Sequence, residues 1–573
     1  MSAANRTFAS LTRPVLVMAL ALLVLSAGNS APFVKDAEPQ SAQWIADIVD
    51  HGHWLLPVDY YGAVNRKPPL FYWLAALLTE ARGAPLDERG ARAVSTVAAA
   101  ALVTVVLEWT TAAIDPATGW LAALFLTGSY AFAVRAATAL TDMLLTALVF
   151  AAYCTVYPVL GGALSRPRLI GFGVLLGLAV LTKGPVAVVL IIFGAALFLL
   201  VTQRSLRSLL ALRAAWPGLL IAAIIAATWY LPALFAGRHE GIGDVFIQEN
   251  LGHFMPSALG GTGEASRPFY FIAMRLLGGA LPLTLLFPVL IWTVCANGFS
   301  NAASRPLLFQ LALMLAVVIF FSAASAKRDD YILPALPPMA ILLAALFTAI
   351  DRRRIAGAIR LRDATLTVIA LLVLVGLSTI LWLRPLTLPA TAQMQSAANS
   401  YAAIFLRGIA GGGWPFLLFL GAEFAGAMLI GVGIVRRHPP VSGVGLATLT
   451  LAATLLWTGV IRPAEALTRS EVHFAPAVRR LAGPAPVYVP HFDPEFSWYY
   501  GQAVPPLPHA IARAYTTGNT ATDIPAAPLY LVARPADLEH LAPPLRSRLV
   551  PVLPSGLEAN PPTLYRLERA PEP

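Results

Sequence analysis

Residues 35–74 read KDAEPQSAQWIADIVDHGHWLLPVDYYGAVNRKPPLFYWL and form the longest polar interruption of this chain before residue 460. The stretch directly follows the first apolar segment and begins with two acids, Asp36 and Glu38. Near its end, Arg66 and Lys67 precede two prolines, which restrict the backbone beside the cations. Acids just beyond an apolar segment, together with cations held in place, predict chemistry on a charged substrate at a membrane surface. An amphipathic connector with solvated charges is the alternative.

The composition around this stretch is that of a membrane protein. Hydrophobic residues make up 58% of the 573 residues, charged residues only 12%, and the mean hydropathy is +0.70. Repeated apolar runs of about 18–25 residues are each long enough to cross a hydrocarbon core of ~30 Å, which excludes a water-soluble globule. The formal net charge of +10 bears on membrane orientation, because cationic loops stay on the cytoplasmic side. No nucleic-acid partner is expected.

Thirteen apolar segments predict an α-helical polytopic membrane protein with about 13 transmembrane helices. The first segment follows Arg6 and Arg13 as in a secretory signal peptide, but it lacks a clean small-x-small cleavage site, so we expect a retained helix. Thirteen spans put the N-terminus inside and the C-terminus outside, and the arginines of the predicted inside loops agree. The segments are residues 14–30, 92–112, 118–134, 140–160, 169–182, 185–202, 214–234, 269–296, 306–324, 331–350, 363–383, 408–435 and 441–461.

The predicted first outside loop, residues 31–91, contains its own helical pattern. Apolar residues recur at helical spacing after Trp44, which predicts helices lying in the membrane interface with Trp44, Trp54 and Trp73 as anchors. The same orientation places all four lysines of the chain on the outside face, each in a compact polar cluster. They are Lys35, Lys67, Lys183 and Lys327.

Asp142 and Lys183 lie at the edges of apolar segments. Ionisable groups at such depth are costly and usually face a cavity or a partner. We therefore expect these two residues in a functional cavity. The alternative is a structural ion pair, either Asp142 with Arg135 or Lys183 with an acid.

Beyond Arg462 the chain becomes polar and rich in proline. We divide it into a transmembrane module, residues 1–465, and a small soluble α/β extracytoplasmic domain, residues 466–573, with short strands near residues 486–490, 528–533 and 564–567. His491, Asp493 and Glu495 alternate in this domain, but a solvated strand end is the favoured interpretation, and no metal site is predicted.

Several clusters, taken together and in order, resemble a known family. The acidic start of the first loop is followed by RKPPLFYWL at 66–74, ALTDMLLT at 139–146, LTKGPV at 181–186, ENLGHF at 249–254 with SRPFYF at 266–271, and AKRDDYILPALP at 326–337. This order resembles the GT-C class of polyprenyl-phosphate-sugar glycosyltransferases, near the protein O-mannosyltransferase and lipid A aminoarabinose transferase families. The resemblance covers roughly residues 14–350.

The resemblance implies a GT-C fold and an inverting glycosyltransferase. Such enzymes take a sugar from a polyprenyl-phosphate carrier and pass it to a lipid A, glycan or protein acceptor at the outer face of the cytoplasmic (inner) membrane. It implies that Asp36 or Glu38 is the catalytic acid residue, that Asp142 is the acid of the second outside loop, and that Lys67 contacts the carrier phosphate. The chain departs from the family where Arg66 replaces the common glutamate, and where the acids are spaced Asp-Ala-Glu.

The residues themselves fit this chemistry. A sugar on a polyprenyl phosphate is already activated, so an enzyme must stabilise charge on the leaving phosphate and remove the proton of a hydroxyl acceptor. Preorganised cations can stabilise the charge on the phosphate. A carboxylate such as Asp36 or Glu38 can remove the acceptor proton by general base catalysis, which accelerates a reaction by roughly 10²–10⁴-fold. The candidate phosphate-binding residues are Arg66, Lys67, Lys183, Arg267, Lys327, Arg328 and Tyr331.

No cofactor is predicted, because a metal beside Arg66 and Lys67 would face two cations. A divalent metal displaced toward Asp36, Glu38 or His253 is the alternative. Two other classes of protein compete with the transferase. One is a transporter or flippase for a lipid-linked anion, against which the long first loop counts. The other is a membrane-anchored scaffold for the C-terminal domain, which would not need Asp142 or Lys183 at membrane edges.

Overall fold

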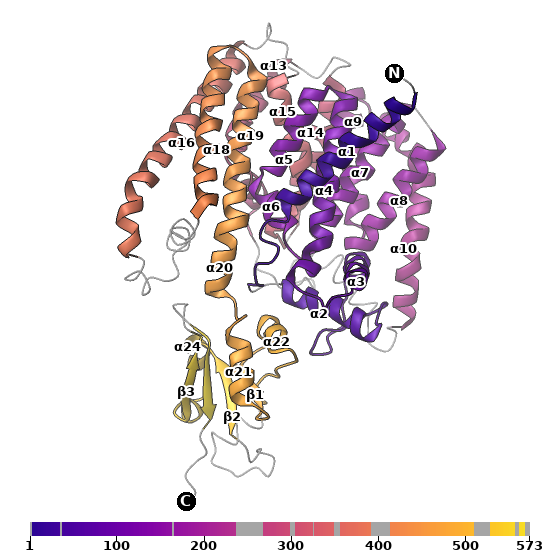
Figure 1. The fold of residues 1–573 in the computed structure, drawn as a ribbon. Helices are drawn as coiled ribbons and strands as arrows, with labels where there is room; N and C mark the ends of the chain where they lie inside the picture. Colours follow the sequence, from indigo (N-terminus) through magenta and orange to yellow (C-terminus); the bar gives the residue numbers. More distant parts are fainter. Residues whose placement is uncertain are drawn as a thin grey trace, which may run out of the picture.

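The chain folds into a helical bundle with a small α/β domain below one end (Figure 1). The N-terminus lies at the opposite end of the bundle from this domain, which contains the C-terminus (Figure 1). The computed structural model describes residues 3–34, 37–162, 165–236, 267–297, 304–324, 326–348, 356–390, 413–508, 528–555 and 561–567.

Each of the thirteen predicted apolar segments coincides with a helix or a bent pair of helices. The α-helices of the bundle are α1 (Ala3–Leu25), α4 (Glu88–Ala113), α5 (Pro116–Thr127), α6 (Tyr130–Ala136), α7 (Asp142–Leu160), α8 (Arg166–Lys183), α9 (Val186–Gln203), α10 (Trp216–Ala236), α12 (Phe271–Gly279), α13 (Phe287–Asn297), α14 (Arg305–Ala323), α15 (Leu336–Thr348), α16 (Ala356–Ala390), α18 (Gly413–Val435), α19 (Pro439–Leu456) and α20 (Arg462–Arg469). Shorter helical turns connect them: η1 (Leu206–Ala215), η4 (Leu283–Leu286), η6 (Asp329–Ala335) and η8 (Trp457–Ile461).

By length and composition, the described residues contain nine helices able to cross a membrane, or eleven if each bent pair is one span. The bent pairs are α5 with α6, at 67°, and α12 with the segment Leu283–Ala296, formed by η4 and α13, at 109°. The two remaining predicted spans are helices with charged ends. The apolar part of α1 begins only at Thr12, and α8 has arginines in its first turn and Lys183 at its last residue.

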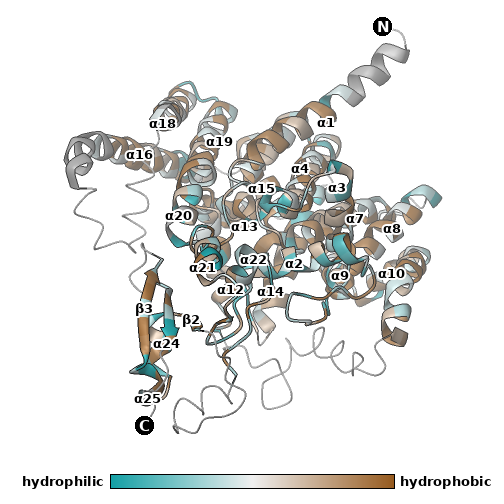
Figure 2. Cartoon of the chain, turned by 60° about the horizontal axis from the view of Figure 1, so that its bottom comes forward, coloured by the Kyte–Doolittle hydropathy of each residue, from teal (hydrophilic) through white to brown (hydrophobic). Residues whose placement is uncertain are grey.

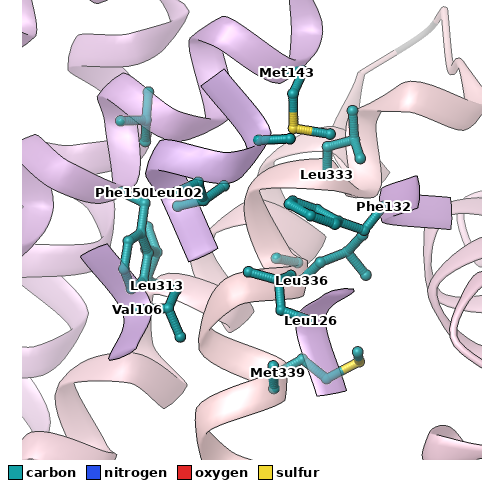
Figure 3. Close-up of a cluster of buried hydrophobic side chains, with 14 of the residues drawn as sticks. Leu102, Val106, Leu126, Phe132, Met143, Phe150, Leu313, Leu333, Leu336 and Met339 are labelled. Carbon is teal, nitrogen blue, oxygen red and sulfur yellow. The ribbon is translucent and has the colours of Figure 1, made fainter. Parts of the chain in front are cut away.

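The buried core lies around α15 and its preceding turn, η6. Within the span Asp329–Thr348, which contains η6 and α15, 94% of the most apolar 18-residue stretch is buried. The corresponding share is 17% for the span Leu206–Ala236, which contains α10. Helix α15 is therefore central in the bundle and α10 peripheral. Figure 3 shows side chains of α4, α6, α7, α14 and α15 meeting in one cluster. Among them, Phe132, Leu313 and Leu336 are fully buried. Close packing of this kind, rather than transfer out of water, holds helices together in lipid.

The first loop forms two helices, α2 (Ala37–His51) and α3 (Leu70–Arg82), at the same end of the bundle as the C-terminal domain (Figure 1). The expected helices are therefore present, but the role of Trp44 differs. Trp44 is only 6% exposed and packs edge-to-face on Tyr72 of α3, with ring centroids 5.6 Å apart, so it stabilises the loop from within instead of contacting lipid. The Trp73 indole N–H donates to the carbonyl of Trp54 at 2.6 Å.

The C-terminal domain contains a four-stranded sheet of order β1-β2-β4-β3, in which β1 and β2 are parallel and the other pairs antiparallel. Three of its strands coincide with the predicted strand-like runs, and the sequence analysis missed β3. The strands are β1 (Val487–Tyr488), β2 (Leu529–Ala533), β3 (Leu549–Pro554) and β4 (Thr563–Leu567). The helices are α21 (Phe474–Ala482), α22 (Pro494–Tyr500), α24 (Pro535–Glu539) and α25 (Pro543–Arg546).

Helix α22 docks the domain onto the first loop. The Tyr61 hydroxyl lies 2.6 Å from Ser497 Oγ and donates to the carbonyl of Val504 at 2.8 Å. The Tyr499 hydroxyl accepts from the Phe33 N–H at 2.7 Å and donates to Glu88 Oε1 at 2.8 Å. Seen from this end, hydrophilic colour gathers on α20 and α21, whereas the other helices of the bundle are mainly hydrophobic (Figure 2). The domain and the first loop thus form one polar layer at the end of the bundle.

Candidate functional site

A cavity of about 490 Å³ brings six of the predicted site residues together. They are Arg66, Lys67, Asp142, Lys183, Arg328 and Tyr331. We call this space the lysine cavity. Its remaining wall is mainly apolar and includes Leu145, Val186, Val189, Phe320 and Phe321. A charged end beside an apolar wall suits a ligand that is itself amphiphilic.

Two helix ends position the central pair of the lysine cavity. Asp142 is the first residue of α7 and Lys183 is the last residue of α8. An acid at a helix N-terminus and a cation at a C-terminus both interact favourably with the helix dipole. Lys183 Nζ lies 2.5 Å from Asp142 Oδ1 and 5.4 Å from the ring centroid of Tyr331. The ion pair given as the alternative to a cavity is therefore present, and it forms part of the cavity wall.

The backbone around Lys67 is held in place before α3 begins. The Lys67 N–H donates to Asn65 Oδ1 at 3.0 Å, and Pro68 and Pro69 follow directly. Lys67 Nζ lies 5.9 Å from the ring centroid of the buried Trp44. The ammonium group is thus presented from a restrained turn, as the Pro pair predicted.

Two predicted phosphate-binding residues do not line the lysine cavity. Arg267 forms an ion pair with Asp329, at 3.0 Å between Nη1 and Oδ1. Lys327 is only 7% exposed and donates from Nζ to the carbonyls of Arg267 and Ala324. These contacts connect the residues just before α12 to the residues between α14 and η6.

Glu38 is buried, although its place in the polar stretch directly after the first apolar segment predicts an exposed side chain at the end of a span. Its two carboxylate oxygens accept from Nε and Nη2 of Arg92 at 2.8 and 3.1 Å, and Oε1 also accepts from the N–H of Ala139 at 2.8 Å. Arg462 Nη2 lies 3.6 Å away. Burial raises the pKa of Glu38, but the two guanidinium groups and the Ala139 N–H outweigh it and hold the pKa below its ordinary value of 4.5. Asp36 and His253 lie outside the described residues.

Glu38 lines a second cavity, of about 800 Å³, which we call the arginine cavity. Its charged residues are Glu38, Arg92, Arg135, Arg275, Asp329, Arg462, Glu465 and Arg469. Leu140 lines both cavities, so they adjoin.

Sequence reasoning missed one acid of the lysine cavity, Asp330. Its side chain is 5% exposed and pairs with Arg135, which lines the arginine cavity. The signal was present in AKRDDYILPALP, where two adjacent acids open an apolar span, because an acid at that depth needs a partner or a cavity.

The acids of the C-terminal domain have local structural contacts. Asp493 caps α22 by accepting from the Phe496 N–H at 3.0 Å, and Glu495 Oε1 accepts from the Glu471 N–H at 3.0 Å. Within the part of the chain that the structure describes, no group of three or more His, Cys, Asp or Glu side chains is arranged to hold a metal ion.

Comparison with known proteins agrees with this architecture. The family model described as dolichyl-phosphate-mannose-protein mannosyltransferase matches residues 66–231. A curated relative, the undecaprenyl phosphate-alpha-4-amino-4-deoxy-L-arabinose arabinosyl transferase of Pectobacterium atrosepticum, is 26% identical over 353 residues, which is 60% of each protein. An enzyme of the same name from Pseudomonas aeruginosa is 27% identical over 358 residues, 61% of this chain and 62% of that protein. The match thus spans about three fifths of the length of these relatives.

The solved structures extend the likeness to almost the whole chain. The crystal structure of ArnT from Cupriavidus metallidurans in the apo state is 20% identical, covers 97% of this chain and 98% of its own, and superimposes with a TM-score of 0.70. The structure of the same protein bound to undecaprenyl phosphate is 19% identical, covers 96% of this chain and 97% of its own, and superimposes with a TM-score of 0.70. The resemblance found in the sequence is confirmed, and the chain has the fold of the GT-C glycosyltransferases.

Proposed function

We propose that the chain is a membrane glycosyltransferase that moves a sugar from a polyprenyl-phosphate carrier to a lipid, glycan or protein acceptor, with inversion at the anomeric carbon. The observation that carries this proposal is the lysine cavity, where six residues singled out from sequence surround one space with an apolar wall. The relatives support the donor class, since one is named for undecaprenyl phosphate-linked aminoarabinose and a solved neighbour holds undecaprenyl phosphate.

The charge of the lysine cavity suits a phosphate leaving group. Four cations, Arg66, Lys67, Lys183 and Arg328, face two acids, Asp142 and Asp330, which leaves an excess of two positive charges. Cations fixed before the reaction stabilise the charge that develops on the phosphate oxygen without further reorganisation. Asp142 keeps Lys183 in place, and the apolar wall accommodates the first units of the prenyl chain. The sugar then lies at the polar end, where an acceptor can approach.

The base that removes the acceptor proton stays a prediction for Asp36, Glu38 and Asp142. Glu38 is poorly suited to this role, because both of its oxygens accept hydrogen bonds from Arg92. Its contacts instead anchor the start of α2 to α4.

We also propose that the chain lies in the cytoplasmic (inner) membrane, with its site and C-terminal domain on the periplasmic side; the multi-pass fold supports a membrane location. The first loop and the C-terminal domain lie at the same end of the bundle, which supports a shared side (Figure 1). A reporter active only outside the cytoplasm should be active when fused after Pro573 and silent when fused after Arg354. The reverse pattern would move the site to the cytoplasmic face.

The test of the activity is transfer from a panel of polyprenyl-phosphate sugars, each labelled in the sugar, by membranes containing the chain. We expect release of the carrier phosphate together with a labelled acceptor for at least one donor, and loss of both in Lys183→Ala membranes. Absence of transfer from every donor, or equal transfer by Lys183→Ala, would reject the proposal.

A further inference from the structure

A third cavity, of about 340 Å³, lies among the ends of α15, α16, α18 and α19. These helix ends are at the opposite end of the bundle from the C-terminal domain (Figure 1). We call this space the distal cavity. Its apolar wall includes Leu346, Phe347 and Ile434, and its charged residues among those described are Arg362, Asp363 and Arg437. It shares no described lining residue with the lysine cavity or the arginine cavity, so it is a separate site.

Arg362 is fixed in the wall of the distal cavity by its neighbours. Its Nη1 donates at 3.0 Å to the carbonyl of Leu346, in the last turn of α15, where carbonyls lack a helical partner. Its Nε and Nη2 both donate to Asp363 Oδ1, at 3.0 and 2.8 Å. These bonds use three of the five guanidinium N–H groups, and the other two make no hydrogen bond to the described residues. Arg362 therefore closes the end of α15 and still has donors for an anion.

Arg437 brings a second guanidinium group to the distal cavity from a backbone position that favours glycine. Its φ is +52°, and the N–H groups of Arg437 and His438 donate to the carbonyls of Ile434 and Gly433 at 3.1 and 2.8 Å. This is the Schellman ending of a helix, in which glycine is the usual residue at the position of Arg437. The Arg437 side chain makes no hydrogen bond or ion pair to the described residues. A structural role thus accounts for Arg362 but not for Arg437.

The charge and the surroundings of the distal cavity indicate its ligand. Two guanidinium groups face one carboxylate, which leaves an excess of one positive charge. Guanidinium groups bind phosphate well, because their planar fork matches two of its oxygens. The neighbouring helices α16 and α18 are open to lipid, since only 17% and 28% of their most apolar stretches are buried. A basic pocket between the ends of membrane helices suits the headgroup of an anionic lipid.

We propose that the distal cavity binds the phosphate headgroup of an anionic phospholipid, with the acyl chains along α16 and α18. Arg437 and the two remaining N–H groups of Arg362 would contact the phosphate, and Asp363 would keep Arg362 in place. A single negative charge on the lipid compensates the excess charge of the cavity. In the proposed orientation this lipid belongs to the cytoplasmic leaflet, which is the more anionic one.

The test measures which lipid the purified chain retains. The chain in detergent is titrated with dioleoylphosphatidylglycerol or with dioleoylphosphatidylcholine, and bound lipid is counted by native mass spectrometry. We expect wild type to prefer phosphatidylglycerol, and Arg437→Gly to bind it about tenfold more weakly, as for the loss of one contact to a charged group. Because glycine suits a positive φ, this variant should fold at least as well as wild type.

The matched control is Arg204→Gly. Arg204 ends α9 at the same end of the bundle and also has a positive φ, of +51°, but it lines none of the three cavities. The control variant therefore removes the same charge from the same backbone conformation, and we expect it to bind phosphatidylglycerol as wild type does. Arg437→Lys, which keeps the charge without the fork, should bind between wild type and Arg437→Gly.

Three outcomes would overturn the proposal. One is equal binding of the two lipids by wild type, and another is equal binding of phosphatidylglycerol by wild type and Arg437→Gly. An equal loss in Arg204→Gly would assign the effect to surface charge in general. Displacement of the lipid by an equal concentration of inorganic phosphate would identify a soluble phosphate as the ligand and would also reject the lipid. Since the readout is bound lipid and not transfer, failure here leaves the proposed function untouched.

Discussion

Lys183 Nζ lies 2.5 Å from Asp142 Oδ1, and the two side chains come from the end of α8 and the start of α7. Each helix presents the charge that its own dipole favours at that end. The pair therefore joins two neighbouring helices and at the same time places an ammonium group on the wall of the lysine cavity. Structural and ligand-binding roles coincide here, and suitable variants can separate them.

The first prediction concerns this pair. Lys183→Met leaves Asp142 buried and unpaired, so we expect a loss of stability of about 3 kcal/mol, the low end for breaking a buried pair, together with loss of donor binding. The double variant Asp142→Asn/Lys183→Met removes the uncompensated charge. We expect it to regain the thermal stability of the wild type but not its donor affinity. Recovery of both would confine Lys183 to a structural role.

A second prediction concerns Lys67. Removing one charge-assisted contact to the phosphate costs about 1.5–3 kcal/mol, so Lys67→Ala should lower kcat/KM for the donor by roughly 10- to 100-fold. Lys67→Arg should restore part of this, because a planar fork and a compact ammonium differ in reach. The control is Arg82→Ala, which breaks an exposed ion pair with Asp87 at the far end of α3. Wild-type kinetics in Lys67→Ala would show that Lys67 does not bind the phosphate and would support the alternative of an amphipathic connector with solvated charges.

The third prediction is a pH dependence of stability that arises from Glu38. Because its folded pKa is lower than the ordinary value of 4.5, the folded state binds this proton less readily than the unfolded chain. The stabilisation is complete above pH 4.5 and is lost as pH falls through the folded pKa. Thermal unfolding of the purified chain should show this loss. Glu38→Gln, which leaves the fully buried Arg92 uncompensated, should unfold at lower temperature already at pH 7. Equal stability of variant and wild type at pH 7 would contradict the anchoring role.

Glu38 was one of two catalytic candidates from the sequence, and a purely catalytic role would leave the fold of Glu38→Gln intact; its buried ion pair with Arg92 predicts a loss of stability instead. For the other candidate, Asp36, we expect that Asp36→Asn abolishes transfer by a folded protein. Full activity of Asp36→Asn would remove it from the catalytic candidates.

The fourth prediction is that transfer needs no added metal. Arg66 and Lys67 both line the lysine cavity, and a divalent cation beside them would meet two positive charges. We expect chelator-treated enzyme to keep its rate, with no gain from magnesium, manganese or zinc. Activity that disappears on chelation and returns with one metal would show that Arg66 has not taken the place of a cation.

The sequence predicted the helices well because the bilayer imposes a length and a composition on every span. It was less informative about pairing. Glu38 and Arg92 are 54 residues apart, and Asp142 and Lys183 are 41 apart. Which acid meets which cation is decided by how the helices pack, and no local pattern contains that information.

The errors at the site have the same origin. Glu38 appeared exposed because it follows the first span, yet α4 covers it with Arg92. Trp44 appeared to face lipid, yet α3 folds back and buries it. Asp330 was overlooked because its pairing with Arg135 and its place in the wall of the lysine cavity exist only once η6 has packed beside α6 and α7.

The most direct test of the central claim is a structure of the purified chain with undecaprenyl phosphate. We predict the phosphate within hydrogen-bond distance of Lys183 Nζ and Lys67 Nζ, with the prenyl chain along Val186, Phe320 and Phe321. A phosphate bound in the arginine cavity, or no lipid in the lysine cavity at saturating undecaprenyl phosphate, would contradict it.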